Sequence, residues 1–315
     1  MHHMRFPSVY ERMFPRWRPR ADLRPRGVGQ GAPLRLSWLG TAGYVIESPG
    51  ACVLVDPFLT RGSLLATALK PIVPDEDAIR RHLPPRVDAV LCGHSHYDHV
   101  ADAPLAARLT GAKLVGSAST CAWGRAAGLP EAKLVHVPAG GALVHVGDLE
   151  IRFVPSRHGR VTVGPVKVPQ LPGEVLTPPR GPGRVMHYKM GGAFGILVRA
   201  PGVTLYHNGS ADLVDAELEG ERADVLVAGL AGRRGTQNYV ARLLGALSPR
   251  VVIPTHHDAF FAPLERGVHL LPGIDLDGFV SEVALRSPEA RVVTPGYLEW
   301  VAVGERGENA VIATG

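Results

Sequence analysis

The chain of 315 residues contains no apolar run that approaches the roughly 20 residues needed to cross a bilayer. Arginines and prolines interrupt its N-terminus throughout, so the apolar core of a signal peptide is also missing. Only three cysteines occur, Cys52, Cys92 and Cys121, and they form neither a metal-binding nor a redox pattern. The expected compartment is therefore the reducing cytoplasm.

Two catalytic signatures are absent as well. The sequence has no Gly-x-Ser-x-Gly turn of the kind that presents a serine nucleophile, and no glycine-rich loop that would cradle a phosphate. The absence of a serine nucleophile turn is consistent with a reaction in which water is the nucleophile.

The excess of positive charge lies at one end of the chain. Residues 1–27 carry seven arginines against Glu11 and Asp22, which accounts for the whole net charge of +5. The remainder is balanced, so we expect no nucleic acid partner. The basic N-terminal arm, residues 1–30, could contact a membrane surface or a partner, but packing on its own domain or on a second copy is favoured. Aromatic residues are interleaved with its arginines: Phe6, Tyr10, Phe14 and Trp17.

Hydrophobic periodicity predicts strands that alternate with helices across residues 31–315, which we interpret as one α/β (α+β) domain. Helices are expected near 64–69, 75–83, 100–109, 118–127, 237–247 and 275–287. Hairpins are expected at 34–48, 142–155 and 193–206, and continuous βαβ winding would not produce them. Two mixed β-sheets, each covered by helices on its outer face, account for both features.

Residues 160–190 interrupt this rhythm, because their prolines and glycines preclude a regular element. A long irregular insertion in a compact domain is usually a binding loop, so we interpret this one as a lid. It mixes apolar and basic residues, and this mixture predicts a small or lipid-like substrate with an apolar part and an anionic part. These residues are Val161, Val163, Val166, Val168 and Leu171, with Arg160, Lys167, Arg180, Arg184 and Lys189.

The hexapeptide His94-Ser95-His96-Tyr97-Asp98-His99 is the densest group of potential metal ligands. It follows an apolar run at 87–92 that reads as a buried strand, and Gly93 lets the chain turn. Imidazole nitrogens and a carboxylate suit Zn²⁺, Fe or Mn. In an extended loop His94 and His96 would share one metal, while Asp98 and His99 turn towards a second.

Further ligand-type residues stand just beyond other predicted strands. They are Asp56, His158, the loop from Asn208 to Asp212, and His256. In an α/β architecture, loops at strand ends converge on one crevice, and sites are built there. The sequence therefore predicts a single site assembled from five loops.

With these residues in place, the sequence resembles the metallo-β-lactamase fold superfamily. The His-x-His-x-Asp-His motif is intact at 94–99, and the turn at 39–43, Asp56-Pro57, His158 and Pro254-Thr255-His256 follow the expected order. The resemblance covers residues 34–303. It is greatest to the branch of ascorbate-6-phosphate lactonase-like and N-acylphosphatidylethanolamine phospholipase D-like hydrolases.

The resemblance implies a four-layer αββα sandwich with a two-metal site, usually of zinc. By position, His94, His96 and His158 would hold the first metal, and Asp98, His99 and His256 the second. Asp56 would orient a ligand imidazole. Asp98 would also orient the attacking water, and the substrate would be an ester, lactone, amide or phosphodiester. Zn²⁺ is the expected cofactor, with Mn²⁺ or Fe as alternatives.

One departure from the family pattern concerns the loop after residues 203–206. The family usually has an aspartate there that bridges the metals, whereas this chain reads Gly209-Ser210-Ala211, with Asp212 two places late. Either Asp212 reaches the metals, or Asp258 substitutes, or the second metal binds weakly. Asp212 could equally cap a helix at 213–218. A degraded second site would make the chain a non-catalytic binding protein on the same fold.

Three further residues are candidates for contact with the substrate or the crevice. His207 ends a strand beside the deviant loop and is a candidate catalytic residue. Tyr97 is another, although its hydroxyl could either point at the crevice or pack outward. His257 could contact substrate or lie on an exposed flank. The remaining histidines show no supporting pattern.

Overall fold

The computed structural model describes residues 8–18, 26–27, 31–163, 166–307 and 311–313. In spatial order, the nine-stranded sheet consists of β1 (Arg26–Gly27), β18 (Val311–Ala313), β17 (Trp300–Val303), β2 (Leu34–Gly40), β3 (Gly43–Glu47), β4 (Cys52–Val55), β5 (Ala89–Leu91), β6 (Lys113–Gly116) and β7 (Leu134–His136). The seven-stranded sheet consists of β16 (Arg291–Val292), β15 (Val251–Thr255), β14 (Val225–Gly229), β13 (Val203–Asn208), β12 (Phe194–Ala200), β9 (Leu149–Pro155) and β8 (Ala142–Val146).

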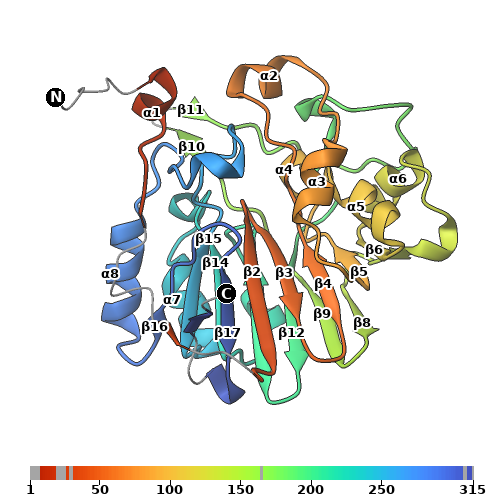
Figure 1. The fold of residues 1–315 in the computed structure, drawn as a ribbon. Helices are drawn as coiled ribbons and strands as arrows, with labels where there is room; N and C mark the ends of the chain where they lie inside the picture. The colour runs from red at the N-terminus through yellow and green to blue at the C-terminus, as the bar shows by residue number, and fades with distance from the viewer. Residues whose placement is uncertain (1–7, 19–25, 28–30, 164–165, 308–310, 314–315) are drawn as a thin grey trace.

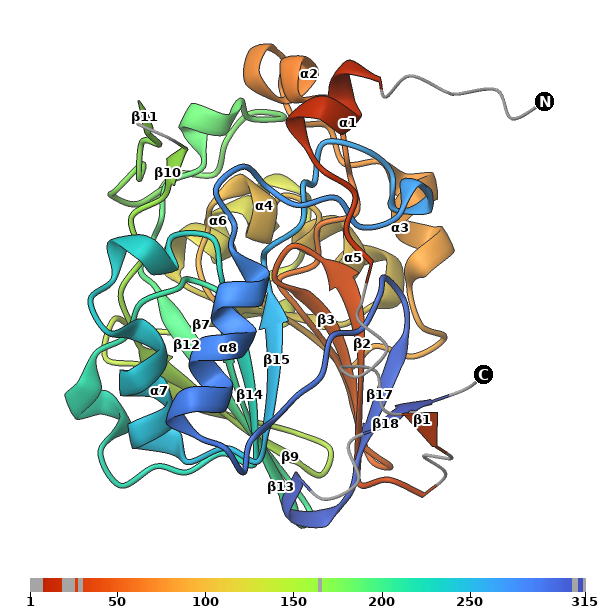
Figure 2. The same cartoon turned by 90° about the vertical axis from the view of Figure 1, so that its left-hand side faces the viewer.

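Helices cover the outer face of each sheet (Figures 1 and 2). The helices of the first half are α2 (Leu64–Leu69), α3 (Glu76–His82), α4 (Tyr97–Val100), α5 (Ala103–Thr110) and α6 (Ala118–Ala126), of which α2 lies at the upper end of the molecule and not on the face of the sheet. α7 (Tyr239–Leu247) and α8 (Leu276–Arg286) cover the seven-stranded sheet, and the short α1 (Val9–Met13) lies near the N-terminus. The predicted four-layer αββα sandwich of two mixed sheets is confirmed.

The facing surfaces of the two sheets form the main core. Alternate residues of the strands point inward, and Leu36, Trp38, Phe153, Ile196 and Leu205 are all fully buried there. Two smaller apolar clusters lie between each sheet and its own helices. With both faces covered, the sheets are held rigidly, so the loops at their ends are fixed in position.

Each sheet has an antiparallel part and a parallel part. The predicted hairpins pair as β2 with β3, β8 with β9, and β12 with β13, whereas β4–β7 and β13–β16 run parallel. The parallel strands β4, β5, β13 and β15 all end at one edge of the sandwich. The loops that carry the predicted ligands leave from this edge, which is uppermost in Figure 1.

Two predictions about local structure are wrong. The helix expected at 100–109 is present as α5, but Asp98 and His99 lie in the short helix α4 and not in an extended loop. The insertion at 160–190 is not wholly irregular. It contains a two-stranded hairpin, β10 (Thr162–Val163) with β11 (Val166–Lys167), and a 3-10 turn at Val185–His187. Three of the four strand residues are β-branched, and such residues favour the hairpin despite the nearby prolines.

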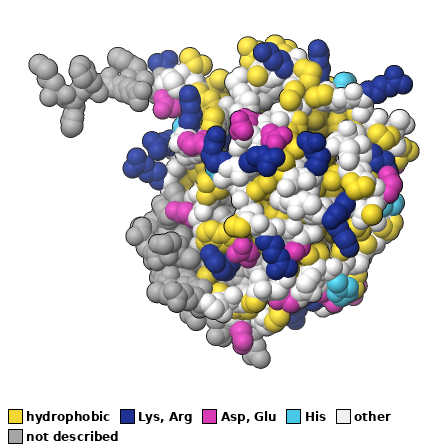
Figure 3. All heavy atoms as spheres, turned by 45° about the vertical axis from the view of Figure 1, so that its right-hand side comes forward, with side chains coloured by type: hydrophobic (Ala, Val, Ile, Leu, Met, Phe, Trp, Pro, Cys, Tyr) yellow, Lys and Arg dark blue, Asp and Glu magenta, His cyan; other side chains and the backbone are white. Residues whose placement is uncertain are grey.

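The described part of the N-terminal arm packs on its own domain. Phe14 is buried against Phe261, and the N–H of Trp17 donates to the carbonyl of Val268 at 2.9 Å. Acidic and basic side chains intermingle across the middle of the face drawn in Figure 3. Among the described residues, no helix has both the length and the apolarity that crossing a bilayer requires.

Candidate metal centre

The structure brings six predicted ligands together in two groups of three. In each group, one ligand atom from every residue lies within 4.8 Å of the others. The first group is His94, His96 and His158, and the second is Asp98, His99 and His256. These are the groupings that the resemblance implied. We refer to them as the first and second triads.

Hydrogen bonds orient the imidazoles of the first triad. His96 Nε2 lies 2.8 Å from the carbonyl oxygen of Gln170, and His158 Nδ1 lies 2.8 Å from that of Gly159. A carbonyl oxygen only accepts, so these two nitrogens carry the protons. The opposite nitrogens therefore present lone pairs, and His96 Nδ1 stands 3.1 Å from His94 Nε2. A metal ligand needs this arrangement, with its outer N–H held by a second group.

Carboxylates organise the second triad. Asp56 Oδ2 lies 2.9 Å from His99 Nδ1, which leaves His99 Nε2 facing Asp98 at 3.9 Å. Asp98 Oδ2 is also 3.3 Å from His256 Nε2. The predicted role of Asp56, orienting a ligand imidazole, agrees with this contact. All of these side chains are buried or nearly so.

The titration behaviour of the triads suits a metal ion. Burial and then the neighbouring His96 lower the pKa of His158 to about 3, and burial also lowers the pKa of His94 and of His96. These imidazoles are therefore neutral at pH 7, the form that coordinates metals. Burial opposes ionisation of Asp98, but His99 and His256 outweigh it, so the pKa of Asp98 is lowered. The neutral imidazoles of the first triad and the ionised carboxylate of Asp98 are donors that fit a divalent cation.

The loops that carry the ligands hold unusual backbone conformations. Positive φ occurs at Thr41 (54°), Asp56 (44°), Leu171 (42°), Ala211 (57°) and His256 (52°). Residues other than glycine rarely adopt this region, and they do so mainly where surrounding contacts over-determine the backbone. Here such contacts exist, because the N–H of His256 donates to the carbonyl of Thr41 at 2.8 Å.

Glycines allow the loops to approach one another. The N–H of Gly93 donates to Asp56 Oδ1 at 2.7 Å, and a Cβ on Gly93 would lie only 3.2 Å from Asp56 Oδ2. Gly209 is similarly close to Asp56, and the carbonyl of Ser210 accepts from the N–H of Gly159 at 2.7 Å. The Ser210 hydroxyl is buried and has no hydrogen-bond partner among the described residues. This orphaned oxygen lies in the loop where the resemblance implies a bridging aspartate.

The structure does not bring Asp212 to either triad. Its carboxylate lies 3.6 Å from the Arg242 guanidinium and accepts from the N–H of Leu213 at 2.8 Å. The alternative prediction, a helix cap, is also wrong. The following 3-10 helix begins at Asp215, and its N-cap is Val214. The loop turns through the positive φ at Ala211, and the sequence pattern did not reveal this reversal.

Replacement of Asp212 by alanine is expected to leave the metal content of the purified protein unchanged, because its carboxylate contacts Arg242 instead of the triads. The matched variant Asp98→Ala should lose about one equivalent of metal per chain. Inductively coupled plasma mass spectrometry of both variants measures the difference. A loss of metal in Asp212→Ala would show that the Asp212 carboxylate is a metal ligand after all.

Asp258 and His257 are also engaged away from the triads. The Asp258 carboxylate accepts from the N–H of Thr41 at 2.8 Å and from the Tyr297 hydroxyl at 2.7 Å, and it pairs with Arg61 at 3.1 Å. His257 is neither exposed nor free to contact substrate. It is buried, and its ring stacks on that of Trp38 at 4.7 Å. Burial lowers the pKa of His257 to about 4.

His207 and Tyr97 are placed in packed surroundings. His207 is buried, and its Nε2 donates to the carbonyl of Ala42 at 2.8 Å. The Tyr97 ring packs edge-on against Phe58 at 5.7 Å and against Phe260 at 6.2 Å. Neither residue belongs to a triad, and for Tyr97 the outward-packing alternative fits these contacts.

Sequence reasoning missed two groups that support the site. Arg61 is buried against Asp258, yet nothing in its sequence context marks it as a buried cation. The carbonyl of Gln170 fixes His96, but a backbone atom has no signature in a sequence. The spacing of 12 residues between His158 and Gln170 gives no hint that the Gln170 amide also donates to the His158 carbonyl.

A cavity of about 340 Å³ adjoins the first triad at His158. Pro155, Pro172, Met190 and Phe194 give it an apolar wall, while Arg157 and Gln170 supply polar groups. Pockets for small molecules have this combination of an apolar lining with a few polar groups.

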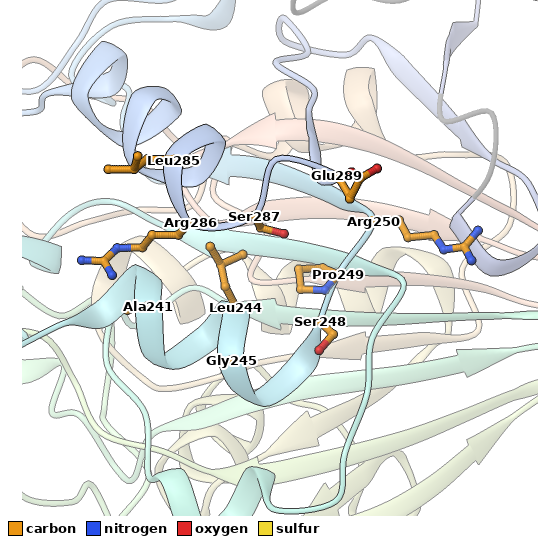
Figure 4. Close-up of a pocket in the computed structure, with 10 residues that line it drawn as sticks. All are labelled: Ala241, Leu244, Gly245, Ser248, Pro249, Arg250, Leu285, Arg286, Ser287 and Glu289. Carbon is orange, nitrogen blue, oxygen red and sulfur yellow. The ribbon is translucent and has the colours of Figure 1, made fainter.

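A larger hollow of about 780 Å³ lies between the ends of α7 and α8, where Arg250 and Arg286 extend away from each other (Figure 4). No predicted ligand lines it. Its Ser248 hydroxyl accepts from Arg222 at 2.9 Å. Size alone does not make a site, so we place the chemistry at the triads.

Residues 35–256 match the sequence profile described as "Beta-lactamase superfamily domain". A protein named "UPF0173 metal-dependent hydrolase" from Anaeromyxobacter dehalogenans (strain 2CP-C) is 30% identical over 233 residues. The aligned region covers 71% of this chain and 75% of the relative.

Two solved structures share the fold. Igni18, described as a novel metallo hydrolase from Ignicoccus hospitalis, has a TM-score of 0.54 and 17% identity, with 85% of this chain and 97% of that chain covered. CmlA, a diiron beta-hydroxylase from Streptomyces venezuelae, has a TM-score of 0.53 and 15% identity, with 85% of this chain and 54% of that chain covered. At these identities the likeness concerns the fold alone.

Proposed function

The chain belongs to the beta-lactamase superfamily of metal-dependent hydrolases, and from this premise we propose a specific reaction for it. Water attacks an ester, lactone, amide or phosphodiester bond in a small or lipid-like substrate that has an apolar part and an anionic part. The observation that carries this proposal is the pair of triads beside the cavity at His158.

We propose that the two triads hold two metal ions and that both are zinc. Three nitrogen ligands at one position and two nitrogens with a carboxylate at the other suit zinc, and they also suit iron or manganese. When bound, such ions supply a Lewis acid for the scissile group and acidify water to a pKa of roughly 7.

The side chains of the protein then position the reactants. Asp98 is ionised and faces both His99 and His256, so it accepts a hydrogen bond from the attacking water and fixes its direction. Asp56 keeps His99 in one tautomer. The hydroxyl of Ser210 is neutral and cannot replace the charge of a bridging carboxylate, so the centre is more positive than in relatives that have an aspartate there. An anionic substrate is favoured by this difference.

The cavity supports the substrate class. Met190, Pro172 and Phe194 would contact the apolar part, and the exposed Arg157 would meet the anionic part. Its volume is that of a site for a small ligand or for the end of a longer one. A polymeric nucleic acid fits this space poorly, in agreement with the balanced charge of the body.

We expect protein purified without chelator to contain about two equivalents of zinc per chain, whereas two equivalents of iron or manganese would retain the two-metal site and refute the choice of zinc. It should hydrolyse at least one probe among bis-p-nitrophenyl phosphate, p-nitrophenyl acetate and a γ-lactone. Mass spectrometry of the metals and initial rates measure both quantities on one preparation. Less than one equivalent of metal, with no turnover of any probe, would instead favour a non-catalytic binding protein.

A further inference from the structure

Helix α2 is an apolar helix that the protein leaves uncovered. Its sequence is Leu-Leu-Ala-Thr-Ala-Leu, and none of its six residues is buried. Leu65 is 69% exposed and Leu69 is 60% exposed. A helix this short gains almost all its stability from packing of its apolar face, so a partner that covers these leucines is expected. Both views place α2 at the upper end of the molecule, beyond α4 (Figures 1 and 2).

Most other exposed apolar residues lie at the same end. Of the twelve large hydrophobic side chains that are exposed in the described part of the chain, nine belong to α1, to residues 64–73 or to residues 166–190. We call these three segments the apolar rim. Besides the leucines of α2, its exposed apolar residues are Val9, Met13, Val73, Val168, Leu176 and Met186. Residues 166–190 also line the cavity at His158, so the rim adjoins the entrance to the site.

The apolar rim also carries positive charge that has no internal partner. Its exposed bases are Arg12, Lys70, Lys167, Arg180 and Arg184, and none of them pairs with a carboxylate of the described residues. Elsewhere many arginines are paired, as in Arg125–Glu131 and Arg199–Glu221. The rim itself contains two acids, Glu11 and Glu174, fewer than its five exposed bases, and in the neighbouring first turn of α3 Glu76 is paired with Arg80. Along the upper edge of Figure 3, hydrophobic and basic side chains predominate.

We propose that the apolar rim docks the protein on an anionic phospholipid surface. The exposed apolar side chains would insert shallowly between the lipids, and the unpaired bases beside them would bind the anionic headgroups. A protein partner fits less well, because the rim is divided among three separate short segments and offers no continuous apolar core for an interface. Docking in this orientation places the entrance at His158 against the membrane. That the bound lipid is also the substrate rests on the proposed function. The docking of the rim on the membrane does not depend on it.

The test is flotation of the full chain with phosphatidylcholine vesicles that contain about 30% phosphatidylglycerol. The wild-type protein is expected to float with these vesicles, to float much less with pure phosphatidylcholine, and to dissociate between about 0.1 M and about 0.5 M sodium chloride. The double variant Leu65→Ser/Leu69→Ser should lower the partition coefficient by about tenfold or more. Because no residue of α2 is buried, this variant should fold like the wild type.

Leu285→Ser is the matched control, since Leu285 is 82% exposed on α8, away from the rim. It should bind vesicles as the wild type does. Absence of wild-type binding to anionic vesicles, or equal loss in both variants, would overturn the proposal. So would light scattering that shows a dimer which the double variant converts to a monomer without any vesicle binding. Vesicle binding in protein that hydrolyses no soluble probe would retain the docking and refute the proposed reaction instead.

Discussion

His96→Ala is expected to release the metal of the first triad and to lower kcat/KM by at least about 10³-fold, or ~4 kcal/mol of transition-state stabilisation. The imidazole has two functions that alanine cannot replace. Its Nδ1 faces His94 Nε2 at 3.1 Å, and its Nε2 holds the lid through the carbonyl of Gln170 at 2.8 Å. Metal content and initial rates with the best probe measure the effect.

His136→Ala serves as the control, because His136 is an exposed histidine at the end of β7 and lies in neither triad. Its metal content and rate should equal those of the wild type. If His96→Ala kept both its metal and its turnover, the assignment of the first triad would be wrong.

Asp258→Ala is expected to lower the free energy of unfolding by about 3–5 kcal/mol. The side chains of Asp258 and Arg61 are almost completely inaccessible, so the change leaves a guanidinium buried without its counter-ion. It also removes the acceptors for the N–H of Thr41 and the hydroxyl of Tyr297. Such a loss is a large share of the stability of a typical domain, about 5–15 kcal/mol. Urea unfolding followed by circular dichroism gives the value.

The comparison variant is Glu265→Ala, which breaks the pair with Arg81 at 3.5 Å. Both of those side chains are more than half exposed, so solvent screening should limit the loss to about 0–1 kcal/mol. Equal losses in the two variants would show that the Arg61–Asp258 pair contributes no more than a surface pair.

The resemblance of the sequence to a known family was sufficient to predict which ligands group together, but the sequence did not reveal the groups that support them. His94, His96, Asp98 and His99 stand in a motif whose residue types and spacing are readable, and His158 and His256 each follow a recognisable strand. Asp212 could not be placed, because a single positive φ at Ala211 decides where its carboxylate points. Backbone carbonyls such as that of Gln170 have no residue-type signature at all.

The local elements of the fold were predictable from the sequence, but the order of the strands in each sheet was not. The hairpins and helices follow from periodicity within each segment, whereas the order of strands across each sheet depends on contacts between distant segments. The pairing of β17 with β2 joins residues near opposite ends of the chain, and no local pattern encodes it. The burial of His257 between Trp17 and Trp38 has the same origin, since those rings come from the N-terminal arm and from β2.

The ligands of each triad come from both halves of the sandwich. His94, His96, Asp98 and His99 follow β5 of the nine-stranded sheet, while His158 follows β9 and His256 follows β15 of the seven-stranded sheet. Neither half, folded alone, contains a complete triad. An ion bound in a triad would therefore also cross-link the two layers, and its binding free energy would add to their adhesion. Its full set of ligands would be complete only once both sheets had folded and docked.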